Sequence, residues 1–207
     1  MIGIIDYGIG NRRSVEKAFA AAGADAVLTD DAGRLREAGG LVLLGVGAFR
    51  AAMEALGARG FDELVRERAA AGVPVLGLCL GMQLLFERSE ELGGADGLGL
   101  LRGEVRTLRP RGGLKVPHIG WNVVTFTREA PLVAGLGRTA AFYHVHSLVP
   151  EPADEAVVLG RGEYGGPFVS VVEQGGVMGC QFHPEKSSRT GLALLANFAR
   201  LCTGVPA

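Results

Sequence analysis

The sequence predicts an α/β protein built on an open, mainly parallel sheet with helices on both faces and antiparallel strands in the second half. In the first half, short apolar runs alternate with stretches of helical periodicity, which is typical of a parallel sheet covered on both faces. In the second half, short segments bounded by Gly and Pro follow one another, which indicates antiparallel strands. The 207 residues contain no linker and no internal repeat, so a single domain over 1–207 is expected.

The elements of the first half follow from apolar runs and helical spacing. Val15, Ala18 and Phe19 share one face of the first expected helix, and Asn11 stands at its start. The expected elements are, in order, strand 3–5, helix 11–22, strands 26–28 and 41–44, a helical region over 49–65 that splits at Gly57 and Gly60, strand 73–78 and a helix over 80–86.

The second half is predicted to be rich in strands and to close with one helix. Leu194, Phe198 and Leu201 form one apolar stripe on that helix. The expected elements are antiparallel strands at 105–108, 121–126, 140–145, 157–159, 168–172 and 177–182, and a helix over 190–201.

The composition excludes several classes of protein. The 21 Lys and Arg residues nearly balance 22 Asp and Glu residues, which leaves no overall field to attract nucleic acid. No apolar run approaches the roughly 18 residues of a membrane span, and the N-terminus lacks a signal-peptide pattern. The three cysteines show no C-x-x-C spacing, which favours a reducing compartment. We therefore expect a cytoplasmic protein with no metal, no cofactor and no nucleic-acid or membrane partner.

The segment Gly77-Leu78-Cys79-Leu80-Gly81 has the pattern of a nucleophile elbow, in which a buried strand turns abruptly into a helix. The flanking glycines permit the tight turn, and the backbone N–H of Leu80 would point at a developing oxyanion. Taken alone, the pentapeptide fits a catalytic Cys79 and a buried, inert cysteine equally well.

A second motif, Gln181-Phe182-His183-Pro184-Glu185, directly follows an apolar strand. It is therefore expected at the end of the sheet where ligands of open α/β folds bind. A thiol nucleophile needs a base, and the base needs a residue that orients it. His183 could exchange a proton with Cys79, and Glu185 could hold the imidazole. By itself His183 is better explained as a structural histidine, whereas together with the elbow the catalytic interpretation is favoured.

A third motif, Leu44-Gly45-Val46-Gly47, directly follows a buried strand and could present backbone N–H groups as a second oxyanion donor. It is a poor phosphate loop, because neither a G-x-G-x-x-G pattern nor a Walker lysine follows. An ordinary strand-to-helix turn explains the spacing as well as a functional loop does.

Taken together, Gly77 to Gln83 and His183-Pro184-Glu185 resemble the motifs of class I (triad) glutamine amidotransferases, whose fold is flavodoxin-like. Within that class, several further motifs resemble the glutaminase subunit of imidazole glycerol phosphate synthase, and the resemblance runs from residue 3 to the final helix. These motifs are Asp6-Tyr7-Gly8-Ile9-Gly10-Asn11, Gly45-Val46-Gly47-Ala48-Phe49, Pro117-His118-Ile119-Gly120-Trp121-Asn122 and His146-Ser147.

The resemblance implies hydrolysis of glutamine to glutamate and ammonia, with ammonia passed to a cyclase subunit of (βα)8-barrel fold in histidine biosynthesis. It implies that Cys79 forms a γ-glutamyl thioester, that His183 is the acid and base, and that Glu185 orients it. The remaining residues that it implies are Val46 and Leu80 as oxyanion donors, Gly47, Gln83, Glu91 and Ser147 at glutamine, and Asn11, Trp121 and Lys186 at the partner interface.

Two positions depart from the family pattern. Leu44 stands where the family usually has proline, and His144 stands where an aromatic residue is expected. His144 and His146 would lie on one strand face, which suggests a metal site, but no third ligand lies nearby in sequence and no metal is expected.

Two other functions are compatible with parts of the pattern. A glutaminase that serves a pyridoxal phosphate or purine synthase would share the triad, but the motif from Pro117 to Asn122 argues against it. A catalytically silent binding subunit would keep the fold, but the intact set of Cys79, His183 and Glu185 argues against that.

Overall fold

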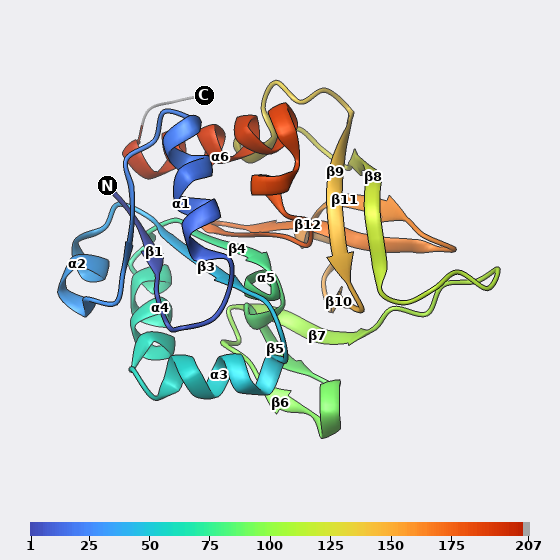
Figure 1. Cartoon of the computed structure of the whole chain (residues 1–207), viewed down its shortest axis with the longest axis horizontal. Coiled ribbons are helices and arrows are strands. Elements are labelled where there is room, and N and C mark those ends of the chain that lie inside the picture. Colours follow the sequence, from blue (N-terminus) through green and yellow to red (C-terminus); the bar gives the residue numbers. More distant parts are fainter. Residues whose placement is uncertain (205–207) are drawn as a thin grey trace.

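The computed structural model describes residues 1–204. Its largest element is an open nine-stranded sheet (Figure 1). Five neighbouring strands on one side of this sheet pair in parallel with one another, and the remaining neighbours pair antiparallel. The predicted α/β architecture is therefore confirmed. Across the sheet the order is β2 (Ala26–Thr29), β1 (Ile2–Ile5), β3 (Leu41–Gly45), β4 (Val75–Cys79), β13 (Val177–Cys180), β12 (Pro167–Gln174), β11 (Val158–Glu163), β8 (His118–Phe126) and β9 (Thr139–His146).

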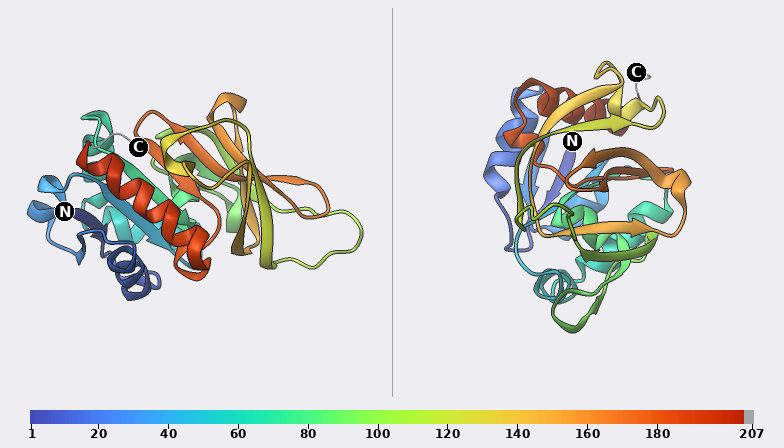
Figure 2. Two further views of the ribbon diagram at one scale, coloured as in Figure 1. Left: turned by 90° about the horizontal axis from the view of Figure 1, so that it is seen from above. Right: turned by 90° about the vertical axis from the view of Figure 1, so that its right-hand side faces the viewer.

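Helices cover both faces of the parallel half, as the apolar runs predicted. On one face lie α1 (Arg12–Ala21) and α6 (Ser188–Thr203), and on the other lie α2 (Ala32–Glu37), α3 (Phe49–Gly57) and α4 (Phe61–Ala70) (Figures 1 and 2). Strand β3 alternates between the two cores: Leu41 and Leu43 face α2 to α4, whereas Val42 and Leu44 face α1 and α6. A strand buried on both faces requires such an uninterrupted apolar run.

A second, four-stranded sheet was not predicted. It contains β10 (Leu148–Pro152), β7 (Leu101–Thr107), β5 (Phe86–Ser89) and β6 (Ala95–Asp96). The helix expected over 80–86 was too long, since α5 (Leu80–Leu84) ends where the carbonyls of Leu84 and Phe86 accept hydrogen bonds from residues 98 and 99. Long-range pairing thus replaces the helical hydrogen bonds that the apolar spacing suggested.

For one strand, the predicted antiparallel pairing is correct on one side and wrong on the other. Strand β13 is antiparallel to β12, as expected, but it is also parallel to β4, with Cys180 level with Leu78. It therefore joins the parallel half of the sheet to the antiparallel half. Four short 3-10 helices complete the described residues: η1 (Glu91–Gly93), η2 (Pro131–Val133), η3 (Glu155–Val157) and η4 (Pro184–Lys186).

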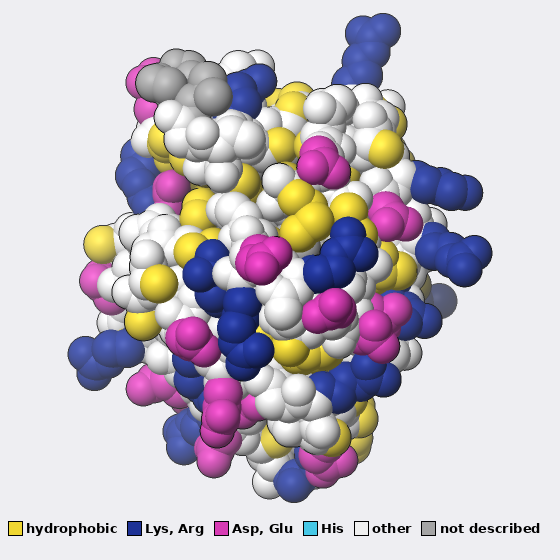
Figure 3. Space-filling view, turned by 90° about the vertical axis from the view of Figure 1, so that its left-hand side faces the viewer, with side chains coloured by type: hydrophobic (Ala, Val, Ile, Leu, Met, Phe, Trp, Pro, Cys, Tyr) yellow, Lys and Arg dark blue, Asp and Glu magenta, His cyan; other side chains and the backbone are white. Residues whose placement is uncertain are grey.

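The surface agrees with the balanced composition. On the face shown in Figure 3, basic and acidic side chains are interspersed, and no large area carries one sign of charge. None of the described helices combines the length and the apolar character needed to cross a membrane.

The close contact of α5 with β3 depends on Gly81, because a Cβ there would overlap the carbonyl group of Leu43. We expect Gly81→Ala to lower the free energy of unfolding by about 1 to 3 kcal/mol or more, as overpacking in a core does. Gly57→Ala is the matched control, since a methyl group at that position, near the end of α3, would have no neighbouring atom within 4 Å. Urea unfolding measures both, and equal midpoints would contradict the steric explanation.

Candidate active site

Cys79 lies at a strained corner between β4 and α5. Its backbone has φ 52° and ψ −110°, a conformation that a residue with a side chain rarely adopts. Gly77 and Gly81 permit it, since a Cβ at Gly77 would contact the backbone of Gly81, and one at Gly81 would contact Leu43. This strand-to-helix corner has the geometry that presents a nucleophile in an elbow.

His183 and Glu185 lie beside Cys79 because β13 runs parallel to β4. The chain leaves β13 at Cys180 and brings His183 to the same sheet edge. The backbone N–H of His183 donates to the Tyr143 carbonyl at 2.9 Å, and the Ser187 hydroxyl donates to the His183 carbonyl at 2.6 Å. These two bonds fix the backbone from which the imidazole extends.

The imidazole of His183 is held by Glu185. Its Nδ1 lies 2.9 Å from Oε1 of Glu185, whose side chain is only 3% exposed. Burial disfavours the charged imidazole, but hydrogen bonds to Cys79 and Glu185 outweigh it and raise the pKa of His183 to about 9. His183 therefore carries a proton at neutral pH, next to the sulfur of Cys79.

The loop after β3 reaches the same place. Val46 is exposed and Gly47 has φ 99°, a conformation suited to glycine. A cavity of about 10 Å³ is lined by this loop together with His183 and Glu185, a volume that holds at most one water. Oε2 of Glu185 is buried and, among the described residues, has no hydrogen-bond partner.

One glutamine side chain, Gln181, contacts the sulfur and a second, Gln83, contacts Gln181; sequence reasoning assigned a role only to Gln83. Nε2 of Gln181 lies 3.8 Å from Sγ of Cys79, and Oε1 of Gln181 accepts a hydrogen bond from Gln83 at 3.0 Å. Gln181 stands in the same motif as His183, so the motif contained the signal. Nε2 of Gln83 also reaches the Leu148 carbonyl at 3.3 Å, which leaves its Oε1 for other contacts.

The other residues expected at glutamine are placed less closely together. Oε2 of Glu91 accepts a hydrogen bond from the backbone N–H of Phe49 at 2.6 Å, so it holds the start of α3 just after Gly47. The Ser147 carbonyl accepts a hydrogen bond from the backbone N–H of Leu108.

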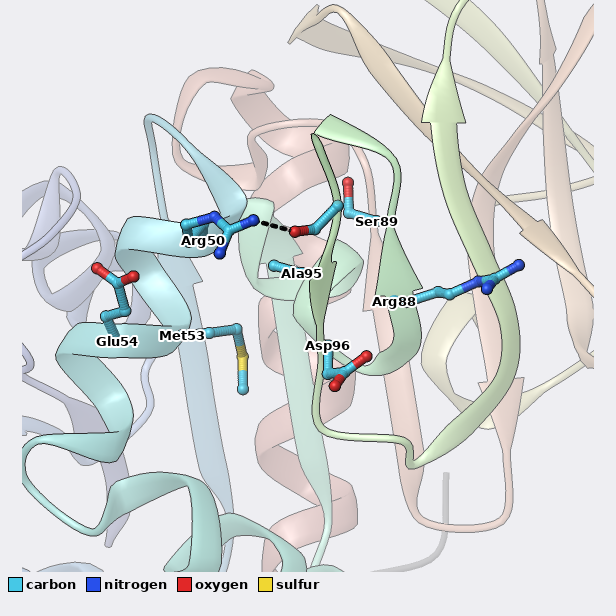
Figure 4. Close-up of a pocket in the computed structure, with 8 residues that line it drawn as sticks. Arg50, Met53, Glu54, Arg88, Ser89, Ala95 and Asp96 are labelled. Carbon is cyan, nitrogen blue, oxygen red and sulfur yellow. Dashed lines mark hydrogen bonds between the residues drawn. The ribbon is translucent and has the colours of Figure 1, made fainter. Parts of the chain in front are cut away.

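A cavity of about 590 Å³ lies between α3 and the β5–β6 strands, where Arg50 bonds to the Gly94 carbonyl (Figure 4). None of Cys79, His183 and Glu185 lines it.

The residues expected at a partner interface are all exposed. Asn11 precedes α1, Lys186 ends η4, and Trp121 lies on β8, where its ring packs edge-on against Tyr143. Trp121 is 54% exposed, and its strand neighbours Ile119 and Val123 are exposed to a similar extent. An apolar strip therefore follows the outer face of β8.

The histidines on β9 take part in a buried cluster. His144 bonds to the Phe142 carbonyl and to Ser170, while His146 bonds to the Leu148 carbonyl and to His118 of β8. Sequence reasoning placed His118 in the Pro117–Asn122 motif but gave it no role of its own, because its proximity to His146 arises from the β8–β9 pairing. Within residues 1–204, no three or more His, Cys, Asp or Glu side chains are arranged to hold a metal ion.

The fold and this site together define a class of protein: a hydrolase or transferase of open α/β fold with a cysteine at an elbow and a His-Glu pair beside it. The family Glutamine amidotransferase class-I matches residues 3–202. A solved structure described as a glutamine amidotransferase has a TM-score of 0.75 at 23% identity, with 98% of both chains covered.

Curated relatives are closer in sequence. Imidazole glycerol phosphate synthase subunit HisH of Moorella thermoacetica is 50% identical over 97% of this chain and 94% of the relative. The protein of the same name from Salinibacter ruber is 49% identical over 98% of this chain and 95% of its own length. The chain therefore belongs to the class-I glutamine amidotransferases and, within them, to the HisH family.

The buried histidines predict how stability depends on pH. Burial, together with neighbouring histidines, lowers the pKa of both His144 and His146 to about 3, so both are neutral in the folded chain. The unfolded chain takes up these protons below about pH 6.5. The free energy of unfolding therefore keeps its full value, as far as these two groups are concerned, above that pH. It falls as the pH decreases toward 3, and the loss is about 2 kcal/mol per imidazole by pH 5.

We expect His144→Phe to remove one imidazole's share of this loss, because phenylalanine does not titrate. Urea unfolding of both chains between about pH 7 and 5 measures it, a window above the usual carboxylate pKa values. Parallel curves for the two chains would show that His144 is not the titrating group.

Proposed function

We propose that the chain hydrolyses glutamine to glutamate and ammonia through a thioester on Cys79, and that it supplies ammonia to the cyclase subunit of imidazole glycerol phosphate synthase. The observation that carries the proposal is the strained Cys79 beside His183, whose Nδ1 is bonded to Glu185 at 2.9 Å. Membership of the HisH family supports the choice of substrate and pathway.

In the first half of the reaction, Cys79 acts as a thiolate whose proton is held by His183, and its sulfur attacks the carboxamide carbon of glutamine. The S–C bond forms, the carbonyl oxygen becomes an oxyanion, and the backbone N–H groups of Leu80 and Val46 stabilise it. The C–N bond then breaks. His183, protonated because of its raised pKa, gives its proton to the leaving nitrogen, which departs as ammonia.

In the second half, water attacks the thioester while the neutral imidazole of His183 accepts its proton. The C–O bond forms and the S–C bond breaks, which releases glutamate and restores the starting state of Cys79 and His183. Glu185 keeps Nδ1 protonated throughout, so that Nε2 faces the sulfur in both halves. Gly47, Gln83, Glu91 and Ser147 are the proposed contacts of glutamine.

The proposed partner is a (βα)8-barrel cyclase, bound as a heterodimer in the cytoplasm. The apolar strip on β8, with Ile119, Trp121 and Val123 each more than half exposed, supports a docking surface there. Asn11 and Lys186 are exposed beside the site and extend the proposed interface.

Cys79→Ala is expected to abolish glutamine-dependent synthesis by the complex and to leave ammonia-dependent synthesis by the cyclase intact. The substitution removes the nucleophile without altering the exposed surface. Product formation from glutamine and from ammonium salt is measured separately, with Cys202→Ser on α6 as the control. Glutamine-dependent activity above about a hundredth of wild type would contradict the role of Cys79.

The cyclase is expected to stimulate the glutaminase. Glycines on both sides of Val46 lower the cost of rotating its peptide so that the N–H faces the oxyanion, and one such donor contributes about 10² to 10³ in turnover. Glutamate release is measured for the chain alone, with cyclase, and with cyclase plus its nucleotide substrate. The rate should rise in that order, and three equal rates would exclude the switch.

A further inference from the structure

A line of hydrogen bonds runs inward from β8 toward the nucleophile. It begins at Asn122, whose Nδ2 donates to the Glu163 carbonyl at 2.8 Å and lies 3.3 Å from Nε2 of His118. Nδ1 of His118 lies 3.0 Å from Nε2 of His146. The two histidines face each other across the β8–β9 pair, so the line passes from one strand to the next.

The line continues to the sulfur. Nδ1 of His146 lies 3.0 Å from the Leu148 carbonyl, which also accepts a bond from Nε2 of Gln83 at 3.3 Å. Gln83 in turn donates to Oε1 of Gln181 at 3.0 Å, and Nε2 of Gln181 lies 3.8 Å from Sγ of Cys79. An unbroken series of polar contacts therefore joins the exposed strand to the reacting atom.

Only one arrangement of protons satisfies the histidine part of this line. The Leu148 carbonyl can only accept, so Nδ1 of His146 carries a hydrogen and its Nε2 accepts. Nδ1 of His118 must then donate, and Nε2 of His118 accepts from Asn122. Both imidazoles are neutral in this arrangement, in agreement with burial lowering the pKa of His118 and, to about 3, that of His146.

The members of the line are shielded from water. His118 is 2% exposed, His146 5%, Gln83 4% and Gln181 fully buried. A buried donor or acceptor that loses its partner has no water to replace it, so breaking one bond leaves two unsatisfied groups. The side chains are therefore expected to keep or lose their arrangement together.

We infer that His118 and His146 are positioning residues for Cys79: through Leu148, Gln83 and Gln181 they hold the sulfur in place and tie that place to strand β8. The inference rests on the proposed function in that the positioned sulfur is the nucleophile of glutamine hydrolysis. Asn122 is the outer end of the line and is adjacent to the exposed Trp121, so a partner that moves β8 would move the same set of bonds.

His144 provides a matched control within the same cluster. Its ring stacks on that of His118 with centroids 5.1 Å apart, and it is equally buried. Its nitrogens bond to the Phe142 carbonyl and to Oγ of Ser170, so it contributes no bond to the line. Loss of the His144 imidazole disturbs the packing of the cluster without interrupting the line.

The test compares His118→Asn, His118→Gln and His118→Leu with His144→Phe. An asparagine amide can occupy the position of Nδ1 and donate to His146, whereas a glutamine amide reaches toward the position of Nε2 and leucine offers no donor. Two properties are measured for each folded chain: glutamate release with the cyclase and nucleotide substrate, and the pH profile of Cys79 alkylation by iodoacetamide, followed on the Cys79 peptide by mass spectrometry.

We expect His118→Leu and His118→Gln to lower kcat by about tenfold or more, as misplaced reacting groups do, and to change the alkylation profile. His118→Asn should retain most of the wild-type rate, and His144→Phe should match the wild type in both measurements. If His118→Leu does not fold, the comparison of Asn with Gln at this position decides the question.

Two results would overturn the inference. One is an alkylation profile for His118→Gln that equals that of the wild type, and the other is equal impairment of His118→Asn and His118→Gln. Absence of glutamate release by the wild-type complex would instead refute the proposed function. The alkylation profiles, which need neither glutamine nor cyclase, would still decide whether the line positions the sulfur.

Discussion

The site depends on one steric constraint, the close packing of the β4–α5 corner against β3. Because Gly77 and Gly81 have no Cβ, the helix start can lie directly against the backbone at Leu43. This contact holds Cys79 in a conformation that costs free energy, of order 1 to 3 kcal/mol for such strained residues. Parallel pairing with β3 on one side and β13 on the other fixes the end of β4 from which this corner departs.

Strand β13 determines which side chains lie next to Cys79. It is the only described strand that pairs in parallel on one side and antiparallel on the other within the nine-stranded sheet. Its end therefore brings His183 and Glu185 to the carboxyl edge of the parallel half, where ligands of open α/β sheets bind. The antiparallel half beyond it carries β8 and its exposed apolar strip.

Two kinds of histidine environment lie close together around Cys79. His183 has a carboxylate partner and gains a proton, whereas His144 and His146 are buried without one and remain neutral. The neutral imidazoles can then donate and accept at the same time, which a charged imidazolium cannot do. Burial and the presence or absence of a carboxylate partner thus give these histidines different charge states at neutral pH.

By itself the sequence determined the alternation of buried strands and helices, the corner at Cys79 and the His183–Glu185 pair, because each is encoded by residues close together in the chain. The second sheet, the end of α5 at Leu84 and the parallel pairing of β13 with β4 were found only in the tertiary structure. The tertiary structure also determines the line from His118 to Cys79, in which the long-range contacts join residues between 28 and 102 positions apart. Such contacts depend on strand order and register, which local periodicity does not specify.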